Sequence, residues 1–153
     1  AIAGGCLLAL ACDYRHGVFG FHRMGLNEMA LSLDLPKSVF SILATTINPN
    51  YLFEVASQCK LYFPWQAFDR GLINEYVNNP LIGKKKSSEI ALLKAIKLAN
   101  FYIDAGEPFC RLKKIYTTNS DFDHEILVKN WFSSKTQTKL KTALRKLEKK
   151  SNN

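Results

Sequence analysis

The composition of this chain changes abruptly where Asn78-Asn79-Pro80 is followed by Gly83-Lys84-Lys85-Lys86. Asn, Pro and Gly favour turns and interrupt helices and strands. Residues 1–83 carry five Lys/Arg against six Asp/Glu, whereas residues 84–153 carry sixteen against seven. This break predicts two regions, 1–82 and 83–153, of which the first is nearly neutral and the second strongly basic.

The first region shows the signals of an α/β fold. Gly4-Gly5 precedes an apolar helical stretch from Cys6 to Cys12, and Asp13-Tyr14-Arg15 is a plausible extended exit from it. Pro36 favours the first turn of a second helix, and Asn48-Pro49-Asn50 separates that helix from a third. A short helix opens at Pro64-Trp65 and stops at Gly71, after which Leu72 to Val77 is typical of a strand.

The second region is predicted to be helical. An apolar stripe follows Ile90, Leu93, Ile96 and Ile103 at helical spacing. Ser134 and Gln137 form a capping-box pattern ahead of a helix with a narrow apolar stripe and a broad lysine-rich face. We expect this last helix to dock on another surface.

The bulk composition limits the classes of protein that this chain can represent. The 153 residues are 47% apolar, which suffices for one core. No run approaches the roughly 20 apolar residues of a membrane span. The four cysteines have no spacing typical of zinc sites or disulfide frameworks, and His16, His22 and His124 have no metal-ligand spacing. We therefore expect an intracellular protein without a metal or a separate cofactor.

Two features could carry chemistry. A Gly-Gly turn before a helix can bring backbone N–H groups close to an anion, although alone it is most often an ordinary turn. Glu28 lies in the apolar segment Met24 to Leu31, where desolvation would raise its pKa and make its carboxylate a stronger base. Exposure statistics alone favour a surface glutamate at such a position.

The basic second region leaves an alternative of another class open. A net charge of +9 over residues 84–153 attracts polyanions, which include nucleic acid, anionic membranes and phosphate-bearing ligands. A basic helical module that binds nucleic acid therefore remains a competing hypothesis.

In combination, the segment from Ala3-Gly4-Gly5-Cys6-Leu7 to Cys12-Asp13-Tyr14-Arg15, followed by Gly25-Leu26-Asn27-Glu28, resembles the crotonase superfamily. It is most similar to the Δ3,Δ2-enoyl-CoA isomerases of that superfamily. The resemblance continues more loosely through Ala67 and Gly71 to Glu75 and into the terminal helices. It implies the C-terminal part of a crotonase-like ββα spiral over 1–82, followed by a helical oligomerisation region over 83–153.

The resemblance implies a mechanism. Glu28 matches the general base and acid that moves a proton from C2 to C4 of a 3-enoyl-CoA, and Gly4 matches one oxyanion N–H donor. Gly5, Cys6, Leu7 and Leu26 match the positions around the acyl-CoA thioester, in which coenzyme A is part of the substrate. The family's hydratases carry a second glutamate where this chain has Leu7, which favours isomerisation in fatty acid degradation over hydration.

The resemblance also implies the setting of the protein. Family members form homotrimers or hexamers through their C-terminal helices, and they are cytoplasmic in bacteria and mitochondrial or peroxisomal in eukaryotes. Complete members carry a further N-terminal segment with the other oxyanion donor, and this chain begins at the glycine turn. A hydratase-like enzyme and an inactive crotonase-fold protein therefore remain alternatives.

Overall fold

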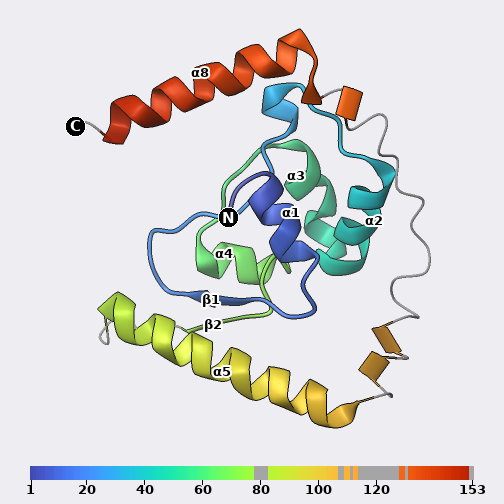
Figure 1. The fold of residues 1–153 in the computed structure, drawn as a ribbon, viewed down its shortest axis with the longest axis vertical. Coiled ribbons are helices and arrows are strands. Elements are labelled where there is room, and N and C mark those ends of the chain that lie inside the picture. Colours follow the sequence, from blue (N-terminus) through green and yellow to red (C-terminus); the bar gives the residue numbers. More distant parts are fainter. Residues whose placement is uncertain (78–82, 107–108, 111, 114–127, 130, 152–153) are drawn as a thin grey trace.

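A group of short helices forms the core of the molecule, and two long helices, α5 (Gly83–Ala105) and α8 (Ser134–Ser151), lie on opposite sides of it (Figure 1). The structure is a computed structural model. It describes residues 1–77, 83–106, 109–110, 112–113, 128–129 and 131–151. The predicted boundary at Asn78-Asn79-Pro80 and the side chain of His124 lie outside the described residues.

The short helices begin and end close to the predicted signals. They are α1 (Gly4–Leu10), α2 (Lys37–Thr46), α3 (Leu52–Ser57) and α4 (Pro64–Asp69), with the 3-10 turns η1 (Met29–Leu31) and η2 (Pro49–Tyr51) between them. Pro36 is the N-cap of α2, and the Asn48 side chain accepts a hydrogen bond at the start of η2. The buried core comprises Cys6, Leu10, Met24, Leu26, Val39, Leu43, Ile47, Val55, Tyr62, Ala67, Leu72 and Ile73.

Three separate stretches of backbone meet beside α1. Ile2 forms a parallel bridge with Gly25, and Met24 forms an antiparallel bridge with Tyr62. Gly25 permits this close approach, because a Cβ at this position would lie 2.3 Å from the Lys60 carbonyl oxygen. These bridges place the start of α1 next to the chain that leads to Glu28.

A two-stranded parallel sheet, with β1 (His16–Val18) beside β2 (Glu75–Val77), lies below the core. Its register pairs His16 with Glu75 and Val18 with Val77. The predicted strand from Leu72 is therefore too long. Gly71 has a φ of 79°, and the Leu72 N–H turns back to the Ala67 carbonyl at 2.8 Å, so this residue cannot join the ladder.

The Arg15 side chain joins α1 to the segment before β2. It is buried, and its guanidinium group donates to the carbonyl oxygens of Leu72 at 2.9 Å, Cys12 at 3.0 Å and Gly71 at 3.4 Å. Burial lowers the pKa of this guanidinium. The segment that leaves α1 leads into β1, and at Arg15 one side chain satisfies three backbone carbonyls.

Helix α5 packs across both strands, but not through the predicted stripe. Its buried positions are Ser87 and Ala91, and Lys94 pairs with Glu75 of β2. Of the predicted stripe, Ile90 is half-buried, whereas Leu93, Ile96 and Ile103 are exposed. The run Gly83–Lys86 is the first turn of this helix and not a loop.

Helix α8 contacts η1, which agrees with a docking helix. Its cap lies one residue earlier than predicted: the Thr136 N–H donates to the Ser133 hydroxyl at 3.3 Å. The Gln137 side chain donates to the Trp131 carbonyl at 2.7 Å and not to a Ser134 cap. Thr136 is fully buried at this contact.

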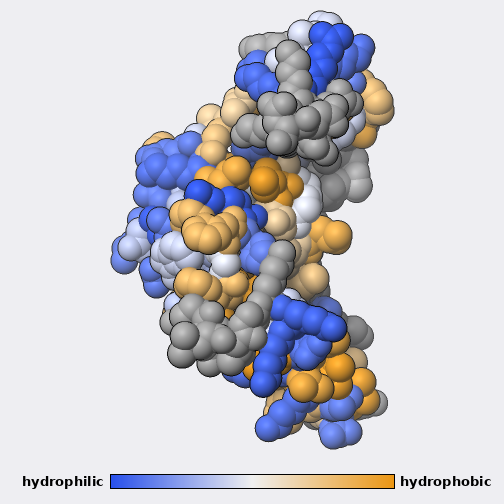
Figure 2. Space-filling view, turned by 90° about the vertical axis from the view of Figure 1, so that its left-hand side faces the viewer, coloured by the Kyte–Doolittle hydropathy of each residue, from blue (hydrophilic) through white to orange (hydrophobic). Residues whose placement is uncertain are grey.

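Hydrophobic surface is exposed in several places in Figure 2, among them the lower end of the molecule, where α5 lies. Several large apolar side chains of this helix are between 47% and 71% exposed, namely Leu92, Leu93, Ile96, Phe101 and Ile103. Among the described residues, no helix is both long and apolar enough to cross a bilayer.

Candidate functional site

Glu28 is buried at the start of η1. Its side chain is 7% exposed although it carries an ionisable carboxyl group. The backbone around it is well held, because the Glu28 carbonyl accepts from the N–H groups of Leu31 at 2.9 Å and Leu33 at 3.0 Å. The local turn therefore fixes both the position and the burial of this residue.

The pKa of the Glu28 carboxyl group is raised, as the apolar sequence around it predicts. Burial raises its pKa, because a charge is costly away from water, and backbone hydrogen bonds from Glu28 and Asn27 partly oppose this rise. One of these is the Asn27 N–H, which donates to the carboxylate at 2.9 Å. The result is an oriented carboxylate of increased basicity.

The glycine turn at the start of α1 offers a backbone donor. The Gly5 N–H donates to the Ile2 carbonyl at 3.1 Å, whereas among the described residues the Gly4 N–H has no acceptor. A Cβ added at either glycine would meet nothing within 4 Å. Ala3, just before them, has a φ of 52°, which directs the chain sharply into the helix. Both glycines are thus exposed, with no neighbour at the Cβ position.

The structure brings the glycine turn and Glu28 together. The Ala3 N–H donates to the Gly25 carbonyl at 3.1 Å, so the two segments are joined by backbone hydrogen bonds. Cys6, on α1, is fully buried, and the pKa of its thiol is raised to about 12, first by burial and then by the charge of Glu28.

The other residues predicted to contact substrate occupy different depths. Gly5 is exposed, Leu7 is partly buried against the core, and Cys6 and Leu26 are core residues with 0% and 1% exposure. Only Gly5 and Leu7 present surface to a ligand in this conformation. Contact between a ligand and Cys6 or Leu26 stays a prediction.

Sequence analysis missed three groups that hold the Glu28 turn. They are the Asn27 N–H, the Cys59 sulfur, which accepts from the Ala30 N–H at 3.2 Å, and the Lys139 ammonium, which donates to the Ala30 carbonyl at 3.0 Å. The last two lie far from η1 in sequence. No local pattern could have identified them, because their role follows from tertiary packing.

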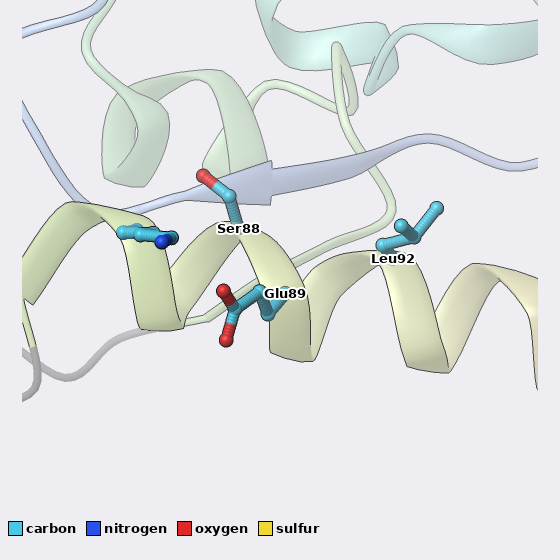
Figure 3. Close-up of a pocket in the computed structure, with 4 residues that line it drawn as sticks. Ser88, Glu89 and Leu92 are labelled. Atoms are coloured by element: carbon cyan, nitrogen blue, oxygen red, sulfur yellow. The ribbon is translucent and has the colours of Figure 1, made fainter.

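A shallow hollow lies elsewhere, on α5. It is lined by Lys85, Ser88, Glu89 and Leu92, and Figure 3 shows the last three projecting from this one helix. The hollow is open to solvent and is made by a different element from those that carry Glu28 and Gly4. Within the described ranges, no group of three or more His, Cys, Asp or Glu residues could hold a metal ion.

No protein-family model and no curated protein sequence matches this chain. Solved structures do match it. The human mitochondrial Δ3-Δ2-enoyl-CoA isomerase superimposes with a TM-score of 0.67 at 22% identity, over 97% of this chain and 58% of the human chain. An enoyl-CoA hydratase/isomerase family protein from Pseudomonas syringae gives 0.63 at 21% identity, over 76% of this chain and 49% of that chain.

A probable enoyl-CoA hydratase from Mycobacterium tuberculosis gives a TM-score of 0.62 at 16% identity, covering 99% of this chain and 56% of its own. At these identities the likeness establishes the fold. The chain carries part of the crotonase fold, as its sequence predicted, and spans about half the length of the matching structures.

Proposed function

We propose that this chain is the part of an enoyl-CoA isomerase that carries the catalytic base. The observation that supports this most strongly is the buried Glu28 carboxylate, whose pKa is raised by burial, on a segment that is hydrogen-bonded to a glycine turn whose Gly4 N–H has no acceptor among the described residues. Both features lie on a crotonase fold. The activity that we assign to this chain is the one named for the longer human isomerase.

The proposed reaction needs one base and an oxyanion donor. Glu28 removes a proton from C2 of a 3-enoyl thioester, and the electrons move onto the thioester oxygen to form an enolate. The Gly4 N–H stabilises this oxyanion, and a single such donor is typically worth about 10² to 10³ in rate. Glu28 then returns the proton at C4, which gives the conjugated 2-enoyl thioester.

Leu7 supports isomerisation over hydration. Hydration requires a second polar group to hold and activate water, and the resemblance places that group at position 7. The Leu7 side chain has no polar atom and packs against the core. A hydratase-like activity would therefore lack its second carboxylate. The nucleic-acid alternative rests on net charge alone, whereas the isomerase proposal is supported by fold, base and donor.

The proposal extends to ligand and assembly. The substrate is an acyl-CoA thioester, with coenzyme A as part of the substrate and no further cofactor. We also propose a homotrimer or hexamer, since the exposed apolar residues of α5 provide a surface that a second copy could cover.

The experiment that tests this function compares two reactions of the protein. A short 3-enoyl-CoA is offered for isomerisation and a 2-enoyl-CoA for hydration, each followed by the absorbance of the conjugated thioester. We expect isomerisation to exceed hydration by at least about tenfold, in keeping with a single-carboxylate site. Equal rates, or no conversion of the 3-enoyl thioester, would contradict the proposal.

A further inference from the structure

Lys139 of α8 reaches the turn that carries Glu28. Its ammonium group donates to the Ala30 carbonyl oxygen at 3.0 Å and also to the Ser32 hydroxyl oxygen. Carbonyls in the last turn of a helix lack partners within it, so an ammonium group is a suitable donor there. These two contacts join residues that lie 109 and 107 positions apart in the sequence.

Two side chains hold the η1 turn at Ala30, one through its N–H group and one through its carbonyl group. The Ala30 N–H donates to the Cys59 sulfur at 3.2 Å, while the Ala30 carbonyl accepts from Lys139. Cys59 follows α3 near the core, and Lys139 comes from the C-terminal helix. Releasing one side would leave Ala30 attached only to the other.

A shift of the η1 turn would move Glu28 as well. Glu28 is the N-cap of η1, and its carbonyl is bonded to the N–H groups of Leu31 and Leu33, on both sides of Ser32. The carboxylate must lie within hydrogen-bond reach of the proton that it transfers. Small errors in its position would therefore reduce the rate.

Lys139 itself is held in place by packing. Thr136, one helical turn before it, is fully buried, and the Ser133 hydroxyl accepts the Thr136 N–H as the helix cap. Residues three apart lie on the same face of a helix. The face of α8 that meets η1 thus includes a buried anchor and a charged donor.

We propose that Lys139 is a positioning residue for Glu28, an inference that rests on the proposed function. It acts through geometry: its ammonium contacts the Ala30 carbonyl and the Ser32 hydroxyl of the turn, whereas the Glu28 carboxylate accepts from the Asn27 N–H. Removing the ammonium should therefore lower turnover by loosening the turn that holds Glu28.

The test compares Lys139→Met with Lys146→Met, an exposed lysine of the same helix, and with Lys139→Arg. For Lys139→Met we expect kcat to fall about tenfold or more, with KM unchanged. Lys139→Arg, which keeps a donor, should recover much of the loss, and Lys146→Met should match the original protein. An unchanged kcat in Lys139→Met, or a loss that appears in KM and not in kcat, overturns the proposal.

A second measurement separates this inference from the proposed function. Hydrogen exchange at the Leu31 and Leu33 amides reports the stability of the turn whether or not the protein turns over substrate. Exchange should be at least about fivefold faster in Lys139→Met than in Lys146→Met. Faster exchange without any isomerisation would sink the proposed function and keep the structural role of Lys139. Equal exchange would sink the positioning role.

Discussion

At the scale of single residues, Glu28 shows why burial and function are connected. An exposed glutamate would be a weak base at neutral pH, since its conjugate acid loses its proton easily. Burial raises the pKa of this carboxyl group and leaves the Asn27 N–H to orient it. The same burial makes the charged side chain a cost to the folded state.

Because the buried charge destabilises the folded state, we predict that Glu28→Gln increases the stability of the protein. Because the folded-state pKa lies above the unfolded value, the penalty is present above the folded pKa and disappears as the pH falls through it. Glutamine keeps an acceptor for the Asn27 N–H but carries no charge. We expect the free energy of unfolding at pH 7 to rise by about 0.5–1 kcal/mol.

Urea denaturation at several pH values checks this prediction. The advantage of Glu28→Gln should shrink as the pH falls toward about 4.3, the ordinary value for glutamate. A loss of more than about 1 kcal/mol at pH 7 would mean that the carboxylate has a structural role instead.

Gly25 predicts a strong steric effect. A Cβ in Gly25→Ala would lie 2.3 Å from the Lys60 carbonyl oxygen, which is backbone and cannot move aside cheaply. We expect a loss of about 1–3 kcal/mol in the free energy of unfolding. In Gly5→Ala the added Cβ meets nothing within 4 Å, so its change should stay within about 0.5 kcal/mol. Equal effects in thermal unfolding would contradict the close approach.

At the scale of elements, Arg15 decides how α1 sits against the segment before β2. Its guanidinium group donates to three carbonyls from both sides of that contact. It is a buried cation whose partners among the described residues are backbone carbonyls and not a carboxylate. A planar group with five donors suits this arrangement better than a lysine would.

Arg15→Met should therefore be strongly destabilising. It leaves buried carbonyl oxygens without donors, and we expect a loss of about 3 kcal/mol in chemical denaturation. Arg23→Met is the matched control. Arg23 is exposed and gives one bond to the Leu61 carbonyl and a contact with the Phe63 ring, worth about 1 kcal/mol or less. Similar losses in the two variants would refute the role of Arg15.

The elements also show what sequence could predict. Turn residues and apolar spacing located α1, α2, α3 and α4, because Pro36, Pro64 and the Asn-Pro break act locally. The start of the strand at Leu72 and most of the apolar stripe of α5 were predicted wrongly, whereas a strand at Glu75–Val77 was predicted correctly. Contacts that the sequence pattern does not show explain both errors. The Leu72 N–H is hydrogen-bonded in a turn to the Ala67 carbonyl, and α5 buries the small residues around Ala91.

The candidate site likewise has one part that the sequence predicts and one part that it does not. Gly4 and Glu28 were predicted from a combination of motifs, and their roles stay predictions, although their segments do lie side by side. Lys139 could not be found, because it is an ordinary lysine in a lysine-rich helix. Its contact with Ala30 depends on where α8 docks.

At the scale of the whole molecule, the two long helices have different surfaces. α8 places its described buried anchor, Thr136, on η1, whereas α5 packs small residues on the sheet and leaves large apolar side chains exposed. Such a surface is typical of a contact with another protein chain. In the proposed trimer or hexamer, a second copy of the chain covers this α5 surface.

Light scattering tests this assembly. We expect the mass of three or six chains for the original protein, and a lower mass for the double variant Leu93→Lys with Ile96→Lys, because charged groups would be buried between copies. Phe53→Lys, on an 80% exposed residue of α3, should leave the mass unchanged. A monomeric original protein, or a double variant of unchanged mass, would show that α5 is not the contact.

The most direct test of the central claim follows the proton that Glu28 is proposed to move. The protein and its Glu28→Gln variant are incubated with a 3-enoyl-CoA in D₂O, and deuterium entering the thioester is measured by NMR or mass spectrometry. The account predicts incorporation with the original protein, through exchange of the proton on Glu28 with D₂O before it is returned to the thioester, and a rate lower by about 10² or more with Glu28→Gln. Equal incorporation by the two proteins would contradict it, because Glu28 would not be the base.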